Sequence, residues 1–155
     1  ILPVVAIGSA TFHLLISLVV WLIFYLLFFG TPQVTLLLFP IVLMPFFLLI
    51  LGFSWFLASL GVYLRDVSQI VGVLTTALMF LSPIFYPMTA LPEEYHIFLQ
   101  FNPLTFIIEQ ARDVMIWGRG MNWIAWVAYW VFAALVAWLG FAWFQKTRAG
   151  FANVL

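Results

Sequence analysis

Charge is scarce in this sequence, which carries five basic and five acidic residues among 155 and has no net charge. Soluble domains average about 25% charged residues, whereas this chain has 6%. The few Lys and Arg residues form no run, so nothing in the composition indicates a nucleic-acid partner or electrostatic attraction to an anionic surface. The scarcity of charge excludes an ordinary soluble domain.

Cysteine is absent, which excludes disulfides, thiolate metal sites and cysteine nucleophiles. The sequence also lacks a phosphate-binding loop, the H-E-x-x-H and G-x-S-x-G motifs, and a cluster of His and carboxylates at metal spacing. We therefore predict no catalytic, cofactor-binding or metal-binding residue, and no ATP hydrolysis by this chain alone. Because the chain opens at Ile1 without Met or a basic leader, we expect it to be a piece of a longer protein.

Long hydrophobic runs dominate instead: 67% of the residues are hydrophobic, and the mean hydropathy is +1.23. Since about 20 helical residues cross a hydrocarbon core of roughly 30 Å, the pattern predicts an all-α polytopic membrane protein. We expect one transmembrane domain over residues 1–155. It would contain four spans and end in a tail over residues 145–155. The spans are expected at about 4–29, 35–60, 67–87 and 123–144.

Residues 88–122 carry too many charges to lie in lipid. Each half of this segment would measure only about 20 Å as a helix, which is too short to cross a bilayer. We expect two short helices that re-enter the membrane or lie at its interface. Asn102 and Pro103 have the residue types of an N-cap and a first helical position, so the second helix should begin there.

The basic residues predict an orientation. Lys146 and Arg148 place the C-terminus in the cytoplasm, and an even number of spans then places Arg65 there too. Arg112 and Arg119 would lie outside. Three basic residues inside against two outside is a small difference, so this topology depends mainly on the two basic residues of the tail.

The densest ionisable group is Glu109, Arg112 and Asp113. One interpretation is an exposed polar helix face with an ion pair worth a few tenths of a kcal/mol. The other is the mouth of a polar pathway at the periplasmic exit. His13, alone inside the first span, has no carboxylate partner in the sequence and is better explained by packing or snorkelling.

Two further groups are candidate sites. Phe80, Phe85 and Tyr86 either face lipid or line a conduit in which aromatic rings stack on sugars. Arg65 and Asp66, beside Tyr63, form either a solvated anchor or a cytoplasmic bend that contacts a partner or gate.

Four motifs, in their order and spacing, resemble the permease subunit of ABC transporters that export O-antigen and related polysaccharides. They are LGVYLRD at 60–66, LSPIFYP at 81–87, NPLT at 102–105 with EQAR at 109–112, and FQKTRAGFA at 144–152. The resemblance covers essentially the whole chain and identifies it with the C-terminal portion of such a permease.

The resemblance implies a homodimer with six spans per subunit in the bacterial inner membrane, paired with two ATPase subunits that bind ATP and Mg²⁺. The cargo would be a polyprenyl-pyrophosphate-linked polysaccharide, moving along residues 67–87. The first two spans and the coupling helix would precede Ile1, and the two short helices over 88–122 would be re-entrant and periplasmic.

Other hypotheses remain open at this point. The permease would equally suit an exporter of capsular polysaccharide or teichoic acid. A membrane glycosyltransferase or lipid-modifying enzyme would use the acidic residues between 93 and 113, and it would turn over without an ATPase. A structural subunit would tolerate changes at these acids.

Overall fold

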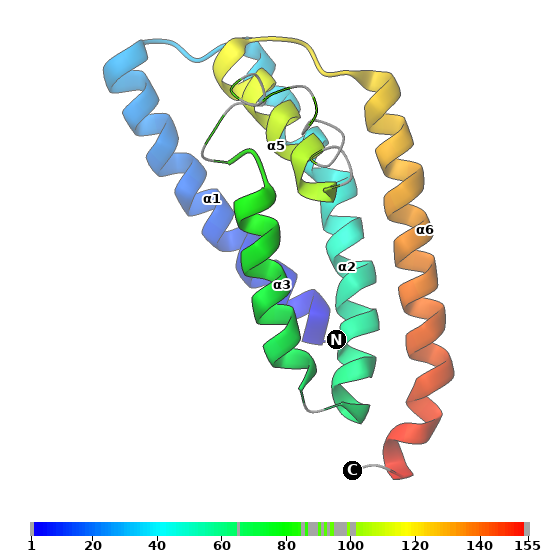
Figure 1. The fold of residues 1–155 in the computed structure, drawn as a ribbon. Coiled ribbons are helices and arrows are strands. Elements are labelled where there is room, and N and C mark those ends of the chain that lie inside the picture. The colour runs from blue at the N-terminus through cyan, green and yellow to red at the C-terminus, as the bar shows by residue number, and fades with distance from the viewer. Residues whose placement is uncertain are drawn as a thin grey trace.

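The computed structural model describes residues 2–64, 66–84, 86, 90, 92, 94, 99 and 102–153. Every regular element in these ranges is helical, so the predicted all-α class is confirmed for this part of the chain (Figure 1). The elements are long, nearly antiparallel helices with one short helix set among them.

The chain first rises and returns through two long helices. Helix α1, Leu2–Phe29, ends at Gly30, whose positive φ of 84° is a conformation that glycine adopts without strain. The short 3₁₀ helix η1, Val34–Leu38, leads into α2, Phe39–Tyr63, and Pro40 lies in the first turn of α2. There its missing N–H costs no hydrogen bond.

Helix α3, Val67–Leu81, runs back beside α2, and its end sets the geometry of the site. Ser82 is extended, with φ −87° and ψ 144°, and precedes Pro83, which disfavours helical backbone in the preceding residue. Figure 1 shows that α3 ends part-way along the bundle, at about the level where α5 begins.

The rest of the chain contains α5, Pro103–Arg112, a π-helical turn η3, Asp113–Trp117, α6, Trp123–Thr147, and a final 3₁₀ helix η4, Arg148–Asn153. The side chains of Asn102 and Asn122 accept hydrogen bonds from Leu104 N and Ala125 N, at 2.9 and 3.2 Å. These are N-caps, and the predicted start of the second short helix is confirmed.

Both termini and the α2–α3 connection lie at one end of the bundle, and residues 30–33 and 118–122 lie at the other, here called the distal end (Figure 1). Helix α5 lies among the long helices in the distal half. Its re-entry into a membrane stays a prediction. The first of the two expected short helices falls almost wholly outside the described residues.

Among the described residues, three helices are long and apolar enough to cross a membrane: Pro3–Phe29, Val34–Tyr63 and Trp123–Gly150. They match three of the four predicted spans. Helix α3 has 15 residues, which extend about 22 Å and fall short of a hydrocarbon core of roughly 30 Å. The span predicted over 67–87 is therefore helical only to Leu81, and a fourth crossing remains a prediction.

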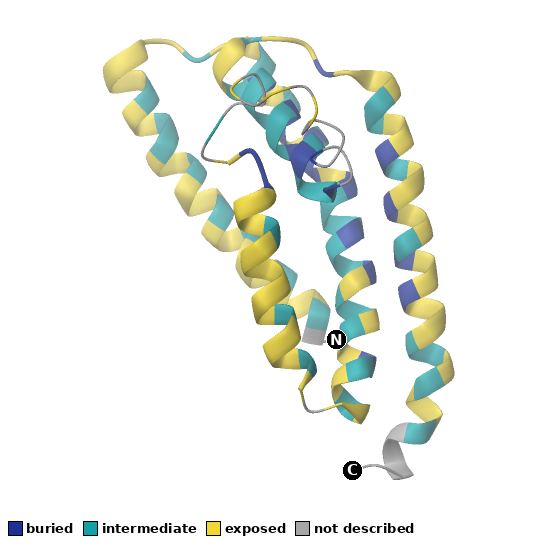
Figure 2. Ribbon diagram, in the orientation of Figure 1, coloured by how far each residue is buried: buried dark blue, intermediate teal, exposed yellow. Residues whose placement is uncertain are grey.

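The core lies between α2 and α6, where buried residues face each other in Figure 2, and Ile107 of α5 and Val114 of η3 complete it at the distal end. Small residues allow close approach: Gly52 on α2 meets Ala137 and Gly140 on α6, and Ala133 is fully buried. Small residues drive helix packing in membranes because backbones can approach closely. By contrast, α1 and α3 are mostly exposed, as apolar helices in lipid or at unfilled interfaces are.

Candidate functional site

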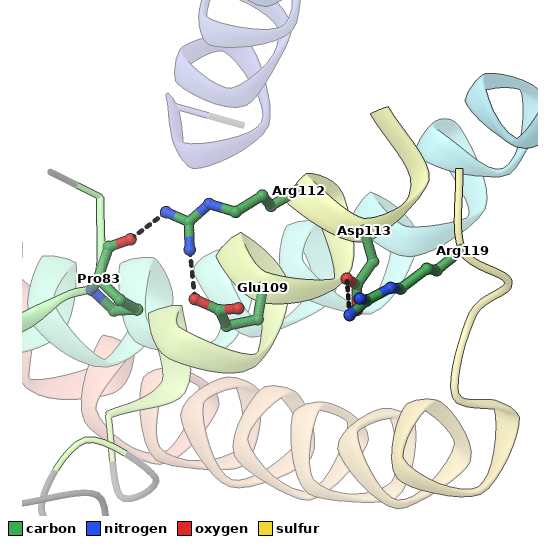
Figure 3. A network of polar contacts seen from close by, with 5 residues as sticks. All are labelled: Pro83, Glu109, Arg112, Asp113 and Arg119. Carbon is green, nitrogen blue, oxygen red and sulfur yellow. Dashed lines mark hydrogen bonds and ion pairs between the residues drawn. The ribbon is translucent and has the colours of Figure 1, made fainter. Parts of the chain in front are cut away.

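The end of α3 and the far end of α5 meet at Arg112. Its guanidinium forms an ion pair with Glu109, three residues earlier on α5, and donates a second hydrogen bond to the carbonyl oxygen of Pro83 (Figure 3). The Arg112 and Glu109 side chains are 18% and 30% exposed. Arg112 therefore both completes a charge pair and satisfies a backbone acceptor just beyond α3.

A second polar contact joins the start of α5 to α3. The Asn102 amide nitrogen donates to Ser82 Oγ at 2.9 Å and to the carbonyl oxygen of Leu78 at 3.3 Å. Ser82 also donates its hydroxyl to the Leu78 carbonyl. Asn102 is 7% exposed and Ser82 is fully buried, so these bonds are shielded from solvent and matter more than surface bonds would.

Asp113 does not join Glu109 and Arg112. It faces Arg119 on the other side of the helix, with 4.0 Å between the charged atoms (Figure 3). Arg119 is 73% exposed and lies 6.0 Å from the Trp117 ring centroid. The predicted group of three is thus two pairs, of which only Glu109 with Arg112 reaches α3.

Further hydrogen bonds connect α5 and η3 to other parts of the bundle. Thr35 donates its hydroxyl to the carbonyl oxygen of Val114 at 2.8 Å, and Gln110 accepts a hydrogen bond from Asn122 N at 2.8 Å. Tyr129 on α6 donates to the carbonyl oxygen of Pro103 at 2.9 Å. The segment formed by α5 and η3 is therefore held from α3, η1 and α6 together.

The predicted channel residues lie near this junction. Phe80 on α3 is 63% exposed, and Tyr86 is half-buried. Phe85 lies outside the described residues. An apolar cavity of about 450 Å³ opens between α2, α3 and the start of α5, and its lining includes Phe53, Leu78 and Leu104.

The predicted cytoplasmic bend lies at the end that holds the termini. Tyr63, at the end of α2, donates its hydroxyl to the carbonyl oxygen of Thr147 at the end of α6, at 3.0 Å. Asp66 precedes α3 and is exposed, and its side chain makes no capping bond. Arg65 lies outside the described residues.

Sequence reasoning missed Ser82, Pro83 and the side-chain amide of Asn102 as contact residues. Asn102-Pro103 was predicted only as the start of a helix. Nothing in that signal indicates a contact between Asn102 and Ser82, 20 residues away, because the contact depends on how α5 packs.

The chemistry of this site is that of a hydrogen-bonding junction. Within the described ranges no group of three or more His, Asp or Glu residues could hold a metal ion. The charged groups present pair with each other or with backbone. The arrangement can hold helices in register.

A family model for ABC-2 type transporters matches residues 1–116, which include α1, α2, α3, α5 and the Arg112 junction. The chain belongs to the ABC-2 type transporter family. An ABC-2 permease is a transport subunit and is not itself catalytic, and the family implies an ABC ATPase as partner. Membership does not support the enzyme hypothesis based on the acids between 93 and 113. No curated protein sequence matches this ABC-2 permease.

Proposed function

We propose that this ABC-2 permease exports a polyprenyl-pyrophosphate-linked polysaccharide of the O-antigen type across the bacterial inner membrane. Two copies would pair with two ABC ATPase subunits, which bind ATP and Mg²⁺ and supply the energy. The C-terminus would be cytoplasmic, and the distal end would be the periplasmic side.

The observation that carries the proposal is the junction of α3 with α5. Polar groups of Glu109 and Arg112 come together with the end of the helix that bears Phe80. A sugar polymer needs hydrogen-bonding groups and flat apolar surfaces, and it must not be held tightly. Charges that are already paired, at the end of a helix whose exposed face carries the Phe80 ring, suit weak and repeated contact. The ordered motifs shared with polysaccharide exporters favour the same cargo.

Residue roles follow within this proposal. Glu109, Arg112 and Asp113 would lie at the periplasmic exit, with Phe80, Phe85 and Tyr86 along the path that leads to it. Tyr63, Arg65 and Asp66 would form a cytoplasmic bend between two spans.

The test is transport by the complete complex. The full-length permease and its ATPase would be reconstituted into phospholipid vesicles with the ATPase sites outside, and polyprenyl-pyrophosphate-linked glycan would be added to the outer leaflet. We expect the glycan to become protected from an added glycan-cleaving enzyme when ATP is present. A hydrolysis-deficient ATPase is the matched control.

Two alternative cargos make the test discriminating. Capsular polysaccharide and teichoic acid polymers would be offered to the same vesicles. ATP-dependent protection of either polymer, with none for the polyprenyl-pyrophosphate-linked glycan, would overturn the proposed cargo and leave the family assignment intact. Glycan cleavage or modification without the ATPase would overturn the transport role.

A further inference from the structure

We propose that Asn102 and Arg112 are positioning residues that brace α5 against the end of α3, so that the two helices move as one unit during the transport cycle. The inference depends on ABC-2 membership and not on the identity of the cargo. It assigns a mechanical role to two side chains at opposite ends of one short helix.

The position of the α3 end creates a need for hydrogen-bond donors. Helix α3 stops at Leu81, part-way along the bundle and among long apolar helices (Figure 1). The last carbonyl groups of any helix have no partner within that helix. At membrane depth, non-helical backbone is tolerated only where protein or a water-filled cavity satisfies it.

Carbonyl groups at the end of α3 accept hydrogen bonds from Ser82 and from Asn102. Leu78 O accepts from Ser82 Oγ and Asn102 Nδ2, and Met79 O accepts from Ser82 N at 3.3 Å. Beyond the helix, Pro83 O accepts from Arg112. Two of these donors, the Asn102 amide and the Arg112 guanidinium, come from α5, and Pro83 is fully buried.

Separating α5 from α3 would cost free energy. Moving α5 away from α3 would leave Pro83 O without the Arg112 donor and would leave the nearly buried Asn102 amide without its acceptors. A buried polar group left unpaired costs more than the paired group contributes. Because the ties lie at both ends of α5, tilting about either end also breaks one of them.

Asn102 has two separable functions, which makes a clean variant possible. Its Oδ1 caps α5, and its Nδ2 reaches α3. Asn102→Ser keeps an N-capping hydroxyl but loses the amide donor. Asn122→Ser is the matched control, because the Asn122 side chain caps α6 by accepting from Ala125 N.

The distance between α3 and α5 can be followed directly. Spin labels would be attached at Leu81→Cys on α3 and at Ile116→Cys on η3, the π turn that continues α5, and both replace exposed side chains. Residues 1–155 contain no cysteine, and any cysteine elsewhere in the full-length permease would be replaced by serine, so that labelling occurs only there. The full-length permease with a cysteine-free ATPase would be measured in vesicles, without nucleotide and with ATP bound to a hydrolysis-deficient ATPase.

We expect one narrow distance population that is the same in both nucleotide states. Asn102→Ser should add a second distance population. The ratio of braced to separated arrangements should fall about tenfold relative to the parent, because leaving one buried hydrogen bond unmade has an energy of that scale. Asn122→Ser should match the parent. A distance that changes with nucleotide in the parent, or an unchanged distribution in Asn102→Ser, would overturn the brace.

A covalent brace gives a second measurement that does not depend on the folding of Asn102→Ser. The double variant Ser82→Cys, Asn102→Cys places thiols on two residues whose side chains are in contact in the structure. The disulfide-linked complex should hydrolyse ATP at the rate of its reduced form, because the helices need not separate. Loss of hydrolysis on oxidation, restored by reduction, would contradict the proposal.

Discussion

Gly140 on α6 lies directly against the backbone of Gly52 on α2. A Cβ atom added to Gly140 would lie 2.1 Å from the Gly52 carbonyl oxygen, and one added to Gly52 would lie 2.7 Å from Ala137 Cα. Both neighbours are backbone, which has no flexible end that can move aside. The contact sets how close the two core helices come, and so where α6 holds α5 through Tyr129.

Gly140→Ala should therefore destabilise the permease. Overpacking a close contact costs about 1–3 kcal/mol, which outweighs the roughly 0.5–1 kcal/mol that Ala gains over Gly inside a helix. The expected result is a lower midpoint of thermal unfolding for the purified permease in detergent.

Gly61→Ala is the matched control, because Gly61 lies in the same helix as Gly52 and an added Cβ there meets nothing within 4 Å. It should leave the midpoint unchanged or raise it. Equal midpoints for Gly140→Ala and Gly61→Ala would show that the backbones are not in contact at this crossing.

Hydrophobicity and local signals predicted much of this fold. Long apolar runs predicted four spans, three of which match helices long and apolar enough to cross a membrane. Asn102-Pro103 predicted the start of α5. Helix α3 ends at Leu81, where extended Ser82 precedes Pro83, and a crossing over 67–87 stays a prediction.

The site was harder to predict, for a physical reason. The ion pair of Glu109 with Arg112 follows from helical spacing and was anticipated as one interpretation. Asp113 shares that stretch of sequence but faces Arg119, since the helix widens to a π turn there and ends at Gly118. The bond from Arg112 to Pro83 joins residues 29 apart, and only tertiary packing creates such a contact.

The paired change Glu109→Ala, Arg112→Ala should lower export while leaving assembly of the permease intact. It removes the donor to Pro83 O, and an unpaired buried acceptor costs about 1–3 kcal/mol. Under the proposed function, the measurement is ATP-dependent glycan protection in vesicles, with co-purification of the ATPase as the check on assembly.

Arg119→Ala is the control for loss of a positive charge in the same segment. Its side chain is 73% exposed and its partner is at 4.0 Å, and exposed ion pairs contribute little. Export by Arg119→Ala should stay near that of the parent. If both variants transport equally well, the Arg112 junction has no role in export.

Gly118 ends the π turn in a left-handed conformation, with φ 63°. Arg119 N then donates to the carbonyl oxygen of Asp113 at 3.0 Å. An L residue in this conformation costs about 1–2 kcal/mol, so Gly118→Ala should lower the unfolding midpoint. Gly120→Ala is the control, because an added Cβ there meets nothing within 4 Å and φ is not positive. Similar midpoints for Gly118→Ala and Gly120→Ala would contradict the left-handed backbone at Gly118.

The orientation of α6 tests the predicted topology. Gly120→Cys and Ala149→Cys place single exposed thiols beyond the two ends of α6, and residues 1–155 contain no other cysteine. Because Lys146 and Arg148 lie at the Ala149 end, the positive-inside rule predicts that this end is cytoplasmic. A membrane-impermeant maleimide added to intact spheroplasts should label Gly120→Cys and should reach Ala149→Cys only after permeabilisation.

The same experiment separates four crossings from three. Both termini lie at one end of the bundle (Figure 1), so a thiol at Val4→Cys, which replaces an exposed residue near the start of α1, should behave like Ala149→Cys. Three crossings would put the two thiols on opposite sides, and labelling of Val4→Cys from outside would then be seen. Shared protection would mean that the segment from α3 to α5 returns the chain to the distal side although α3 alone is too short to cross.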